Sequence, residues 1–211
     1  ICNFITLEQG CSRINVKMKD FDGTEVNGMG PVIDEDAVGR LMELLGSLTK
    51  GDTLVLAGSI PSCMSDSIYR DIMSELNDKG INFVVDATKD LLMNVLEFHP
   101  FLIKPNKHEL GEIFGVELKT RESVVPFAKK LQEMGAKNVL VSMAGEGAVL
   151  LDENENVFML PAPKGTLVNA VGAGDSMVAG FIVGYLKTLN YYTALQYGSI
   201  AGSATAFSDD L

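Results

Sequence analysis

Short apolar runs alternate along this chain with longer segments whose apolar residues recur at helical spacing. The expected strands are Thr53–Ala57, Asn82–Asp86, Phe101–Lys104, Val139–Ser142, Ala148–Leu151 and Val157–Leu160, the last two forming a hairpin. The expected helices are Asp34–Leu48, a segment from Ser65 or Asp66 to Leu76, Thr88–Leu96, Lys107–Phe114, Glu122–Met134, Asp175–Leu189 and Tyr192–Phe207. This alternation predicts an α/β fold with a mostly parallel sheet that helices cover on both faces.

The N-terminal part follows a different pattern. Apolar residues alternate with polar ones over Ser12–Lys19, which predicts a strand with one polar face, and residues 24–26 return as its hairpin partner. We expect residues 1–31 to form a partial β lid whose strands continue into the core, and residues 32–211 to form the α/β core. The chain begins without a Met, within strand-like sequence, so we expect it to be a piece of a longer protein.

Four loops of small and polar residues each follow an expected strand. They are Gly58-Ser59, Lys104-Pro105-Asn106, Ser142 to Gly147, and Gly172 to Asp175. Because ligands of parallel α/β sheets bind beyond the carboxyl ends of the strands, these loops can share one rim.

The last of these loops carries the strongest chemical signal. Gly172, Ala173 and Gly174 are small enough for backbone amides to approach a ligand, and a helix-like segment follows at once. The start of a helix favours an anion, and Asp175 beside it suits a general base. The alternative is a tight turn with Asp175 as a plain N-cap.

Asn106 and Glu109 stand three residues apart at the start of an expected helix. One amide and one carboxylate suit Mg²⁺, which takes few protein ligands and keeps several waters. The alternative is a capping box, with Asn106 as N-cap and Glu109 as its reciprocal partner.

The N-terminal strand places Arg13, Asn15 and Lys17 on one face. Cationic and amide donors in a row suit the phosphate of a sugar phosphate. The alternative is an ordinary solvated strand face.

Composition narrows the class of protein. The net charge of −11 and the isoelectric point near 4.6 disfavour a nucleic-acid partner. Three cysteines imply no disulfide framework and favour a cytoplasmic protein, and no apolar run approaches the ~20 residues of a membrane span. The chain has no Gly-x-x-x-x-Gly-Lys-Ser/Thr loop, so phosphates would be held without one.

The whole string from Thr166 to Gly184 closely resembles the C-terminal signature of the PfkB (ribokinase-like) carbohydrate kinases. The resemblance implies a three-layer α/β/α ribokinase-like sandwich with a small β lid. It also implies that Asp175 is the catalytic base and that Gly172, Ala173 and Gly174 form the anion-binding turn.

Further motifs extend this resemblance over essentially the whole chain. The family's Asn-x-x-Glu motif matches Asn106 and Glu109, which implies a role in binding metal and phosphate, and Lys104 matches a lysine that approaches nucleotide phosphates. The family's nucleotide loop matches Ser142, Gly145 and Gly147, with Ala144 where a glycine is usual.

The substrate motifs resemble particular members of the family. Gly58-Ser59-Ile60-Pro61 is similar to the family's Gly-Ser-Leu-Pro turn, in which the serine approaches the substrate. The segment with Arg13, Asn15 and Lys17 resembles the lid of 1-phosphofructokinases and tagatose-6-phosphate kinases.

The resemblance implies a kinase that uses ATP and Mg²⁺ to phosphorylate a hydroxyl of a phosphorylated hexose. Fructose 1-phosphate is the first expectation, with tagatose 6-phosphate or fructose 6-phosphate as alternatives. It also implies a homodimer through the lid and a missing N-terminal part of the family domain. Outside enzymes, the alternatives are a nucleotide-binding module or an inactive fragment.

Overall fold

The computed structural model describes residues 2–18 and 25–209 and divides into two compact units. Unit 1 comprises Ile1–Asp52 and Ser59–Ile81, and unit 2 comprises Thr53–Gly58 and Asn82–Leu211. Each unit is described by itself.

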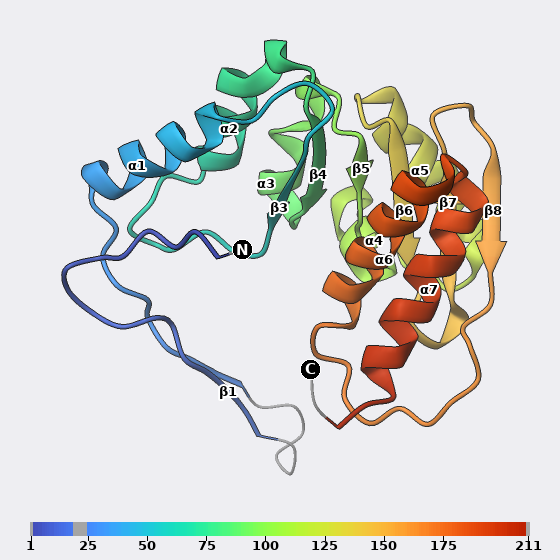
Figure 1. The fold of residues 1–211 in the computed structure, drawn as a ribbon. Helices are drawn as coiled ribbons and strands as arrows, with labels where there is room; N and C mark the ends of the chain where they lie inside the picture. Colours follow the sequence, from blue (N-terminus) through green and yellow to red (C-terminus); the bar gives the residue numbers. More distant parts are fainter. Residues whose placement is uncertain (1, 19–24, 210–211) are drawn as a thin grey trace. The chain divides into compact units, whose positions relative to one another are not determined.

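Unit 2 is built on a six-stranded sheet in the order β3-β4-β5-β6-β7-β8 (Figure 1). The strands β3 to β6 pair in parallel, and β6, β7 and β8 pair antiparallel. The expected mostly parallel sheet and the C-terminal hairpin are therefore confirmed. The strands are β3 (Thr53–Ala57), β4 (Asn82–Asp86), β5 (Leu102–Ile103), β6 (Asn138–Ser142), β7 (Ala148–Leu151) and β8 (Val157–Leu160).

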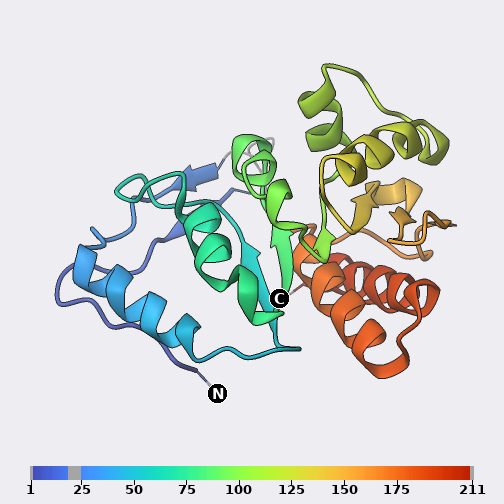
Figure 2. The ribbon, with the colours of Figure 1, turned by 90° about the horizontal axis from the view of Figure 1, so that it is seen from above.

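Helices cover both faces of the β6–β8 part of this sheet (Figure 2). On one face lie α4 (Lys107–Phe114) and α5 (Arg121–Glu133), and on the other lie α6 (Ala173–Thr188) and α7 (Tyr191–Ala206). Phe181 of α6 and Leu195 of α7 pack on Leu140 and Leu150 of the sheet, and all four side chains are fully buried. This burial of apolar side chains holds the layers together.

The helices α6 and α7 approach each other closely because glycines line their contact. A Cβ built on Gly180 would lie 2.6 Å from the carbonyl oxygen of Tyr197. No larger residue fits there without moving a helix.

Some elements differ from the expectation at their ends. The expected helix Thr88–Leu96 is divided into α3 (Lys89–Met93) and the 3-10 turn η2 (Leu96–Phe98). Asn94 caps the end of α3, as suits a residue that favours helix ends. Two further 3-10 turns are η1 (Asn77–Lys79) and η3 (Ala144–Glu146).

Unit 1 contains the expected N-terminal hairpin, β1 (Asn15–Lys17) and β2 (Glu25–Asn27), with Val16 opposite Val26. Its strand is shorter than the expected Ser12–Lys19, and the expected turn lies at residues 19–24, outside the described residues. Unit 1 also holds α1 (Glu35–Gly46) and α2 (Ile68–Leu76). The helix α2 begins later than expected because Ser65 accepts a hydrogen bond from Ser67 N in a local turn.

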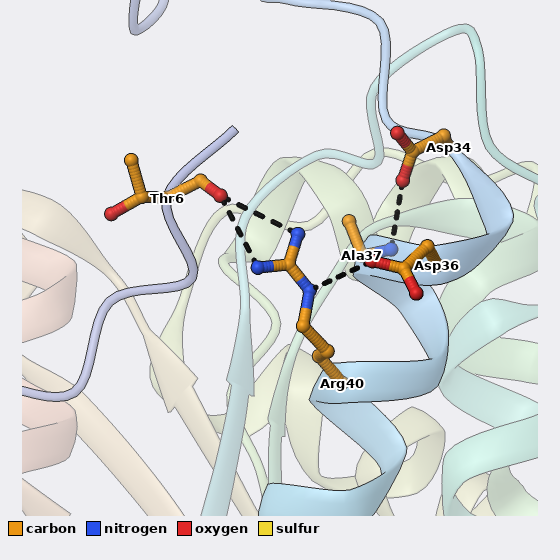
Figure 3. A network of polar contacts seen from close by, with 5 residues as sticks. All are labelled: Thr6, Asp34, Asp36, Ala37 and Arg40. Atoms are coloured by element: carbon orange, nitrogen blue, oxygen red, sulfur yellow. Dashed lines mark hydrogen bonds and ion pairs between the residues drawn. The ribbon is translucent and has the colours of Figure 1, made fainter. Parts of the chain in front are cut away.

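Polar contacts fix the start of α1 to the N-terminal segment (Figure 3). Asp34 accepts a hydrogen bond from Ala37 N at 2.8 Å as the N-cap. The Arg40 guanidinium donates to the carbonyl oxygen of Thr6 and pairs with Asp36, 3.2 Å away.

The compact units do not follow the expected boundary after residue 31. Unit 1 also includes α1 and α2, because hydrogen bonds such as Cys63 Sγ to Pro31 O and Gly51 N to Gly80 O join these segments. That residues 1–31 act as a lid stays a prediction. In the described ranges, no helix has the length and apolarity to cross a bilayer.

Candidate active site

Polar residues gather at the carboxyl ends of the parallel strands in unit 2. Asp86 is the last residue of β4, Lys104 follows β5 and Ser142 ends β6. The Lys104 Nζ lies 3.2 Å from Asp86 Oδ1, and the two side chains are only 7% and 17% exposed. The expected rim therefore carries a nearly buried ion pair.

The pKa of Asp86 is shifted by its burial and by the charges around it. Burial raises the pKa of the Asp86 carboxyl above its usual value; Lys104 opposes this, and the charges of Asp175 and Glu109 raise the pKa further. Carboxylates from β4, α4 and α6 thus share one electrostatic environment. Sequence reasoning missed Asp86, although an acid that ends a parallel strand is a recognisable signal.

The N-terminus of α6 begins with Gly172, which has φ 73° and no side chain to serve as a cap. The Ser176 amide donates to the carbonyl oxygen of Gly172 at 2.9 Å and closes the first turn. A Cβ built on Gly174 would lie 3.2 Å from the Nζ of Lys104, so the turn of Gly172 to Gly174, which was expected to bind an anion, lies against the rim. The Ala173 amide donates to the carbonyl oxygen of Ala170 at 3.3 Å, and first-turn amides of a helix, here those of Gly174 and Asp175, can bind a ligand.

Asp175 is exposed in this first turn and lines, together with Asp86, a cavity of about 350 Å³. The alternative of Asp175 as N-cap is wrong, because Gly172 occupies that position. An exposed carboxylate at the rim can exchange a proton with a ligand.

The N-terminus of α4 holds a complete capping box. Asn106 Oδ1 accepts from the amides of His108 and Glu109 at 2.8 and 2.9 Å, and Glu109 Oε2 accepts from the Asn106 amide at 2.8 Å. The capping alternative is therefore realised, and it leaves Glu109 Oε1 outside these bonds.

The rim offers acidic side chains that could contact Mg²⁺. Across residues 2–18 and 25–209, no group of three or more His, Cys, Asp or Glu side chains is placed to hold a metal ion. Mg²⁺ bound with substrate phosphates uses only one or two carboxylates and keeps waters, and the acids around Asp86 fit that requirement.

A larger cavity of about 690 Å³ joins most of the residues expected to bind the nucleotide. Those that line it are Asn106, Ser142, Gly145 and Gly147. Ala173 and Gly174, which were expected to form the anion-binding turn, line it as well. Sequence reasoning missed its opposite wall, which comes from the segment after β8 and the end of α7: Pro163, Lys164, Gly165, Ala206 and Phe207. The signal was the Pro- and Gly-rich sequence that follows the last strand.

The loop after β6 forms η3 (Ala144–Glu146) and returns into β7. Ala144 has φ 50°, a left-handed conformation that favours glycine, which accounts for the usual glycine at the matching family position. Gly147 has φ 97°, and a Cβ there would lie 2.0 Å from the carbonyl oxygen of Leu160. The sequence therefore has glycine at position 147, where a side chain would clash with the backbone, and tolerates alanine at position 144.

In unit 1 the structure joins two of the predicted substrate residues. The Arg13 Nη1 donates to Ser59 Oγ at 3.1 Å, and both side chains are exposed. Asn15 is exposed in β1, and the prediction for the Lys17 side chain falls outside the described side chains.

Comparisons with known proteins agree with this geometry. The pattern of the pfkB family carbohydrate kinases matches residues 13–209. The chain is 48% identical over 203 residues to the 1-phosphofructokinase of Bacillus subtilis (strain 168), covering 96% of this chain and 67% of that protein. It is 31% identical over 212 residues to the D-tagatose-1-phosphate kinase of Bacillus licheniformis, covering 100% of this chain and 69% of that protein.

A solved structure has the same fold. The crystal structure of phosphofructokinase-2 from Escherichia coli in complex with fructose-6-phosphate matches with a TM-score of 0.80 and 27% identity, covering 92% of this chain and 64% of that one. The expected α/β/α sandwich is thereby confirmed. The chain spans about two thirds of the length of these relatives.

Proposed function

Because the chain belongs to the pfkB family of carbohydrate kinases, as its motifs predicted, we propose that the protein transfers the γ-phosphoryl group of MgATP to a hydroxyl of a phosphorylated hexose. The proposed acceptor is fructose 1-phosphate, which becomes fructose 1,6-bisphosphate. One observation carries the proposal. Asp175 is exposed in the first turn of α6, and the N-cap of that helix is Gly172, which has no side chain to cap it.

In the proposed reaction, Asp175 accepts the proton of the acceptor hydroxyl as its oxygen attacks the γ-phosphorus. The bond from the γ-phosphorus to the leaving oxygen of ADP breaks in the same displacement. The helix start at Gly172, Ala173 and Gly174 stabilises the negative charge on the transferred oxygens. It acts through its dipole and through amides other than that of Ala173, which donates to the carbonyl oxygen of Ala170.

The nucleotide is proposed to bind through Lys104, Asn106, Ser142, Gly145 and Gly147. Support comes from the cavity of about 690 Å³, which the last four of these residues line together. The Lys104 ammonium lies beside Gly174 and would neutralise charge on the phosphates.

Asn106 and Glu109 are proposed to hold Mg²⁺, directly or through water. Glu109 Oε2 is engaged in the capping box, so a metal contact would use Oε1. When bound, Mg²⁺ neutralises charge on the phosphates.

Arg13, Asn15, Lys17 and Ser59 are proposed to recognise the phosphate of the acceptor. The Arg13–Ser59 hydrogen bond supports this role, because it presents a guanidinium and a hydroxyl together. One relative is named for D-tagatose 1-phosphate, which makes that sugar phosphate the second candidate acceptor.

The oligomeric state and the cellular location are also part of the proposal. A homodimer through the lid is supported by the exposed apolar residues of the hairpin, Ile14, Val16 and Val26. A cytoplasmic location is supported by the three free cysteines and by the proposed use of ATP.

The test uses the complete gene product that carries this chain. ADP release with MgATP is measured for fructose 1-phosphate, fructose 6-phosphate, tagatose 1-phosphate and tagatose 6-phosphate, with and without EDTA. We expect the highest kcat/KM with fructose 1-phosphate and loss of turnover with EDTA. No ADP release with any acceptor would favour the nucleotide-binding module.

The variant Asp175→Asn should lower kcat by about 10²–10⁴, the usual contribution of a general base, while calorimetry still detects ATP binding. The matched control is Asp90→Asn, which changes an aspartate in the first turn of α3 and should leave kcat unchanged. Turnover of Asp175→Asn near that of the wild type would refute the assignment.

A further inference from the structure

The segment that leads into α6 is attached to the end of α7. The amides of Val168 and Asn169 both donate to the carbonyl oxygen of Ala206, at 2.9 and 3.1 Å. Asn169 Oδ1 in turn accepts from the amide of Val171 at 3.1 Å. The approach to the anion-binding turn is therefore held by the last residue of α7.

A second attachment lies inside the first turn of α6. Thr205 Oγ1 donates to Ser176 Oγ at 2.7 Å, and both residues are half-buried. Ser176 directly follows Asp175, and its amide bonds to Gly172. A displacement of Ser176 would therefore move both ends of the turn that carries the candidate base.

A third attachment is the close approach of the two backbones. A Cβ built on Gly202 of α7 would lie 2.8 Å from the carbonyl oxygen of Ala173 and 3.2 Å from Met177 Cβ. Only glycine fits at this distance, so the end of α7 meets the start of α6 directly.

The other end of α6 offers a contrast. Thr188 Oγ1 donates to the carbonyl oxygen of Gly184 of its own helix at 2.7 Å and accepts from the amide of Asn190 at 3.3 Å, far from the first turn of α6. Thr188 lies 13 residues beyond Asp175, roughly 20 Å along a helix.

We infer that the C-terminal turn of α7, through Gly202 and Thr205, positions the first turn of α6 for phosphoryl transfer. The inference rests on the proposed function, since it assigns Thr205 as a positioning residue that acts through Ser176 on Asp175. Phosphoryl transfer depends mainly on placement, and a shift of about 1 Å in a catalytic group can cost about 10²-fold.

The test compares three variants of the complete gene product. Thr205→Val keeps the shape and removes the donor; we expect kcat to fall about tenfold or more while KM for ATP changes less than about twofold. Thr205→Ser restores the donor and should recover most of kcat. Thr188→Val removes a similar hydrogen bond at the far end and should leave kcat unchanged.

Thermal unfolding of the same variants separates positioning from stability. If Thr205→Val keeps wild-type kcat, or if Thr188→Val lowers kcat as much at a similar loss of Tm, the inference is overturned. Should Thr205→Val fail to fold, Ser176→Ala removes the acceptor from the other side and must give the same kcat loss.

A double variant makes the test specific to the pair. Ser176→Ala combined with Thr205→Val should lower kcat no further than either change alone, because both remove one contact. Fully additive losses would overturn the inference. If the wild type transfers no phosphoryl group, or if Asp175→Asn is active, the proposed function fails instead, so the two failures are distinguishable.

Discussion

The helices α4 and α6 begin beside the same cavity, but their N-termini are built in opposite ways. Asn106 and Glu109 close the start of α4 with three hydrogen bonds. The start of α6 has Gly172 as its N-cap, and Ala173 and Gly174 line the cavity.

The difference separates a helix start that caps its own amides from one that has no side-chain cap. A capped N-terminus satisfies its own amides and is stable without a ligand. An N-terminus that glycine opens leaves its amides to an anion, and that anion then completes the helix. The start of α4 is therefore fixed by the chain itself, and the start of α6 is the one that an anion would complete in the proposed function.

Breaking the ion pair of Asp86 and Lys104, which lies at the strand ends, should give the largest effect on stability. Lys104→Met leaves the Asp86 carboxylate, which is only 17% exposed, without its counter-charge, so we expect the free energy of unfolding at pH 7 to fall by about 3 kcal/mol. Urea denaturation measures this change. The double variant Asp86→Asn/Lys104→Met should recover part of the loss; an unchanged midpoint in the single variant would contradict the pairing.

The pKa of Asp86 predicts the sign of a change of stability with pH, which the variant Asp86→Asn tests. The raised pKa of Asp86 means that the folded state holds the proton more tightly than the unfolded state. Its contribution to stability is therefore fully present below the usual carboxyl pKa of 3.8 and is lost as the pH rises through the folded-state pKa. Relative to Asp86→Asn, the wild type should gain stability as the pH is lowered toward 3.8. A loss of stability as the pH is lowered would mean that the attraction of Lys104 outweighs the effect of burial on the Asp86 pKa.

At α6, Gly174→Ala should separate stability from activity. Alanine is the better helix former by about 1 kcal/mol, but its Cβ would lie 3.2 Å from Lys104 Nζ. We expect an unchanged or higher Tm with turnover lowered about tenfold, measured by calorimetry and ADP release. Wild-type turnover with a higher Tm would mean that the turn serves only the helix.

At α4, Asn106→Ala removes the cap, and we expect a loss of about 1 kcal/mol in unfolding free energy. The matched control is Thr120→Ala, which opens the capping box of α5, away from the cavity. Both variants should lose similar stability, but only Asn106→Ala should raise KM for MgATP. An equal rise in both would assign Asn106 a structural role alone.

The smallest effect is expected in α7. Ser199 Oγ is buried and has no hydrogen-bond partner among the described residues. Unlike the open amides of α6, this hydroxyl lies outside the residues that line the cavity. Ser199→Ala should therefore raise the unfolding free energy by up to about 1 kcal/mol without changing turnover. A loss of activity would show that an unmet polar group in α7 also serves the site.

Sequence periodicity predicted most elements of unit 2, because each buried strand and each amphipathic helix carries its own local pattern. It placed β3, β4, β7, β8 and α4 at the bounds that the structure has. Residues 161–171 have no such pattern, so the wall that they add to the cavity was not anticipated. Asp86 was missed for a related reason, since a single acid at a strand end has no period.

Contacts between residues far apart in the sequence could not be predicted from local sequence patterns. Arg13 and Ser59 are 46 residues apart and meet through one hydrogen bond in unit 1. Thr205 and Ser176 are 29 residues apart, and neither belongs to a motif that names the other. Only the folded chain brings such side chains within contact distance.

The amino-acid order by itself determined which segments become strands and helices, and where glycine and aspartate stand at the start of α6. Those features depend on neighbours along the chain, whose spacing is set by covalent geometry. Tertiary packing alone decided that Lys104 lies against Asp86 and Gly174, and that the end of α7 meets the start of α6. Such contacts arise because burial of apolar surface is non-directional, so the residues that meet are set by how whole helices and strands pack.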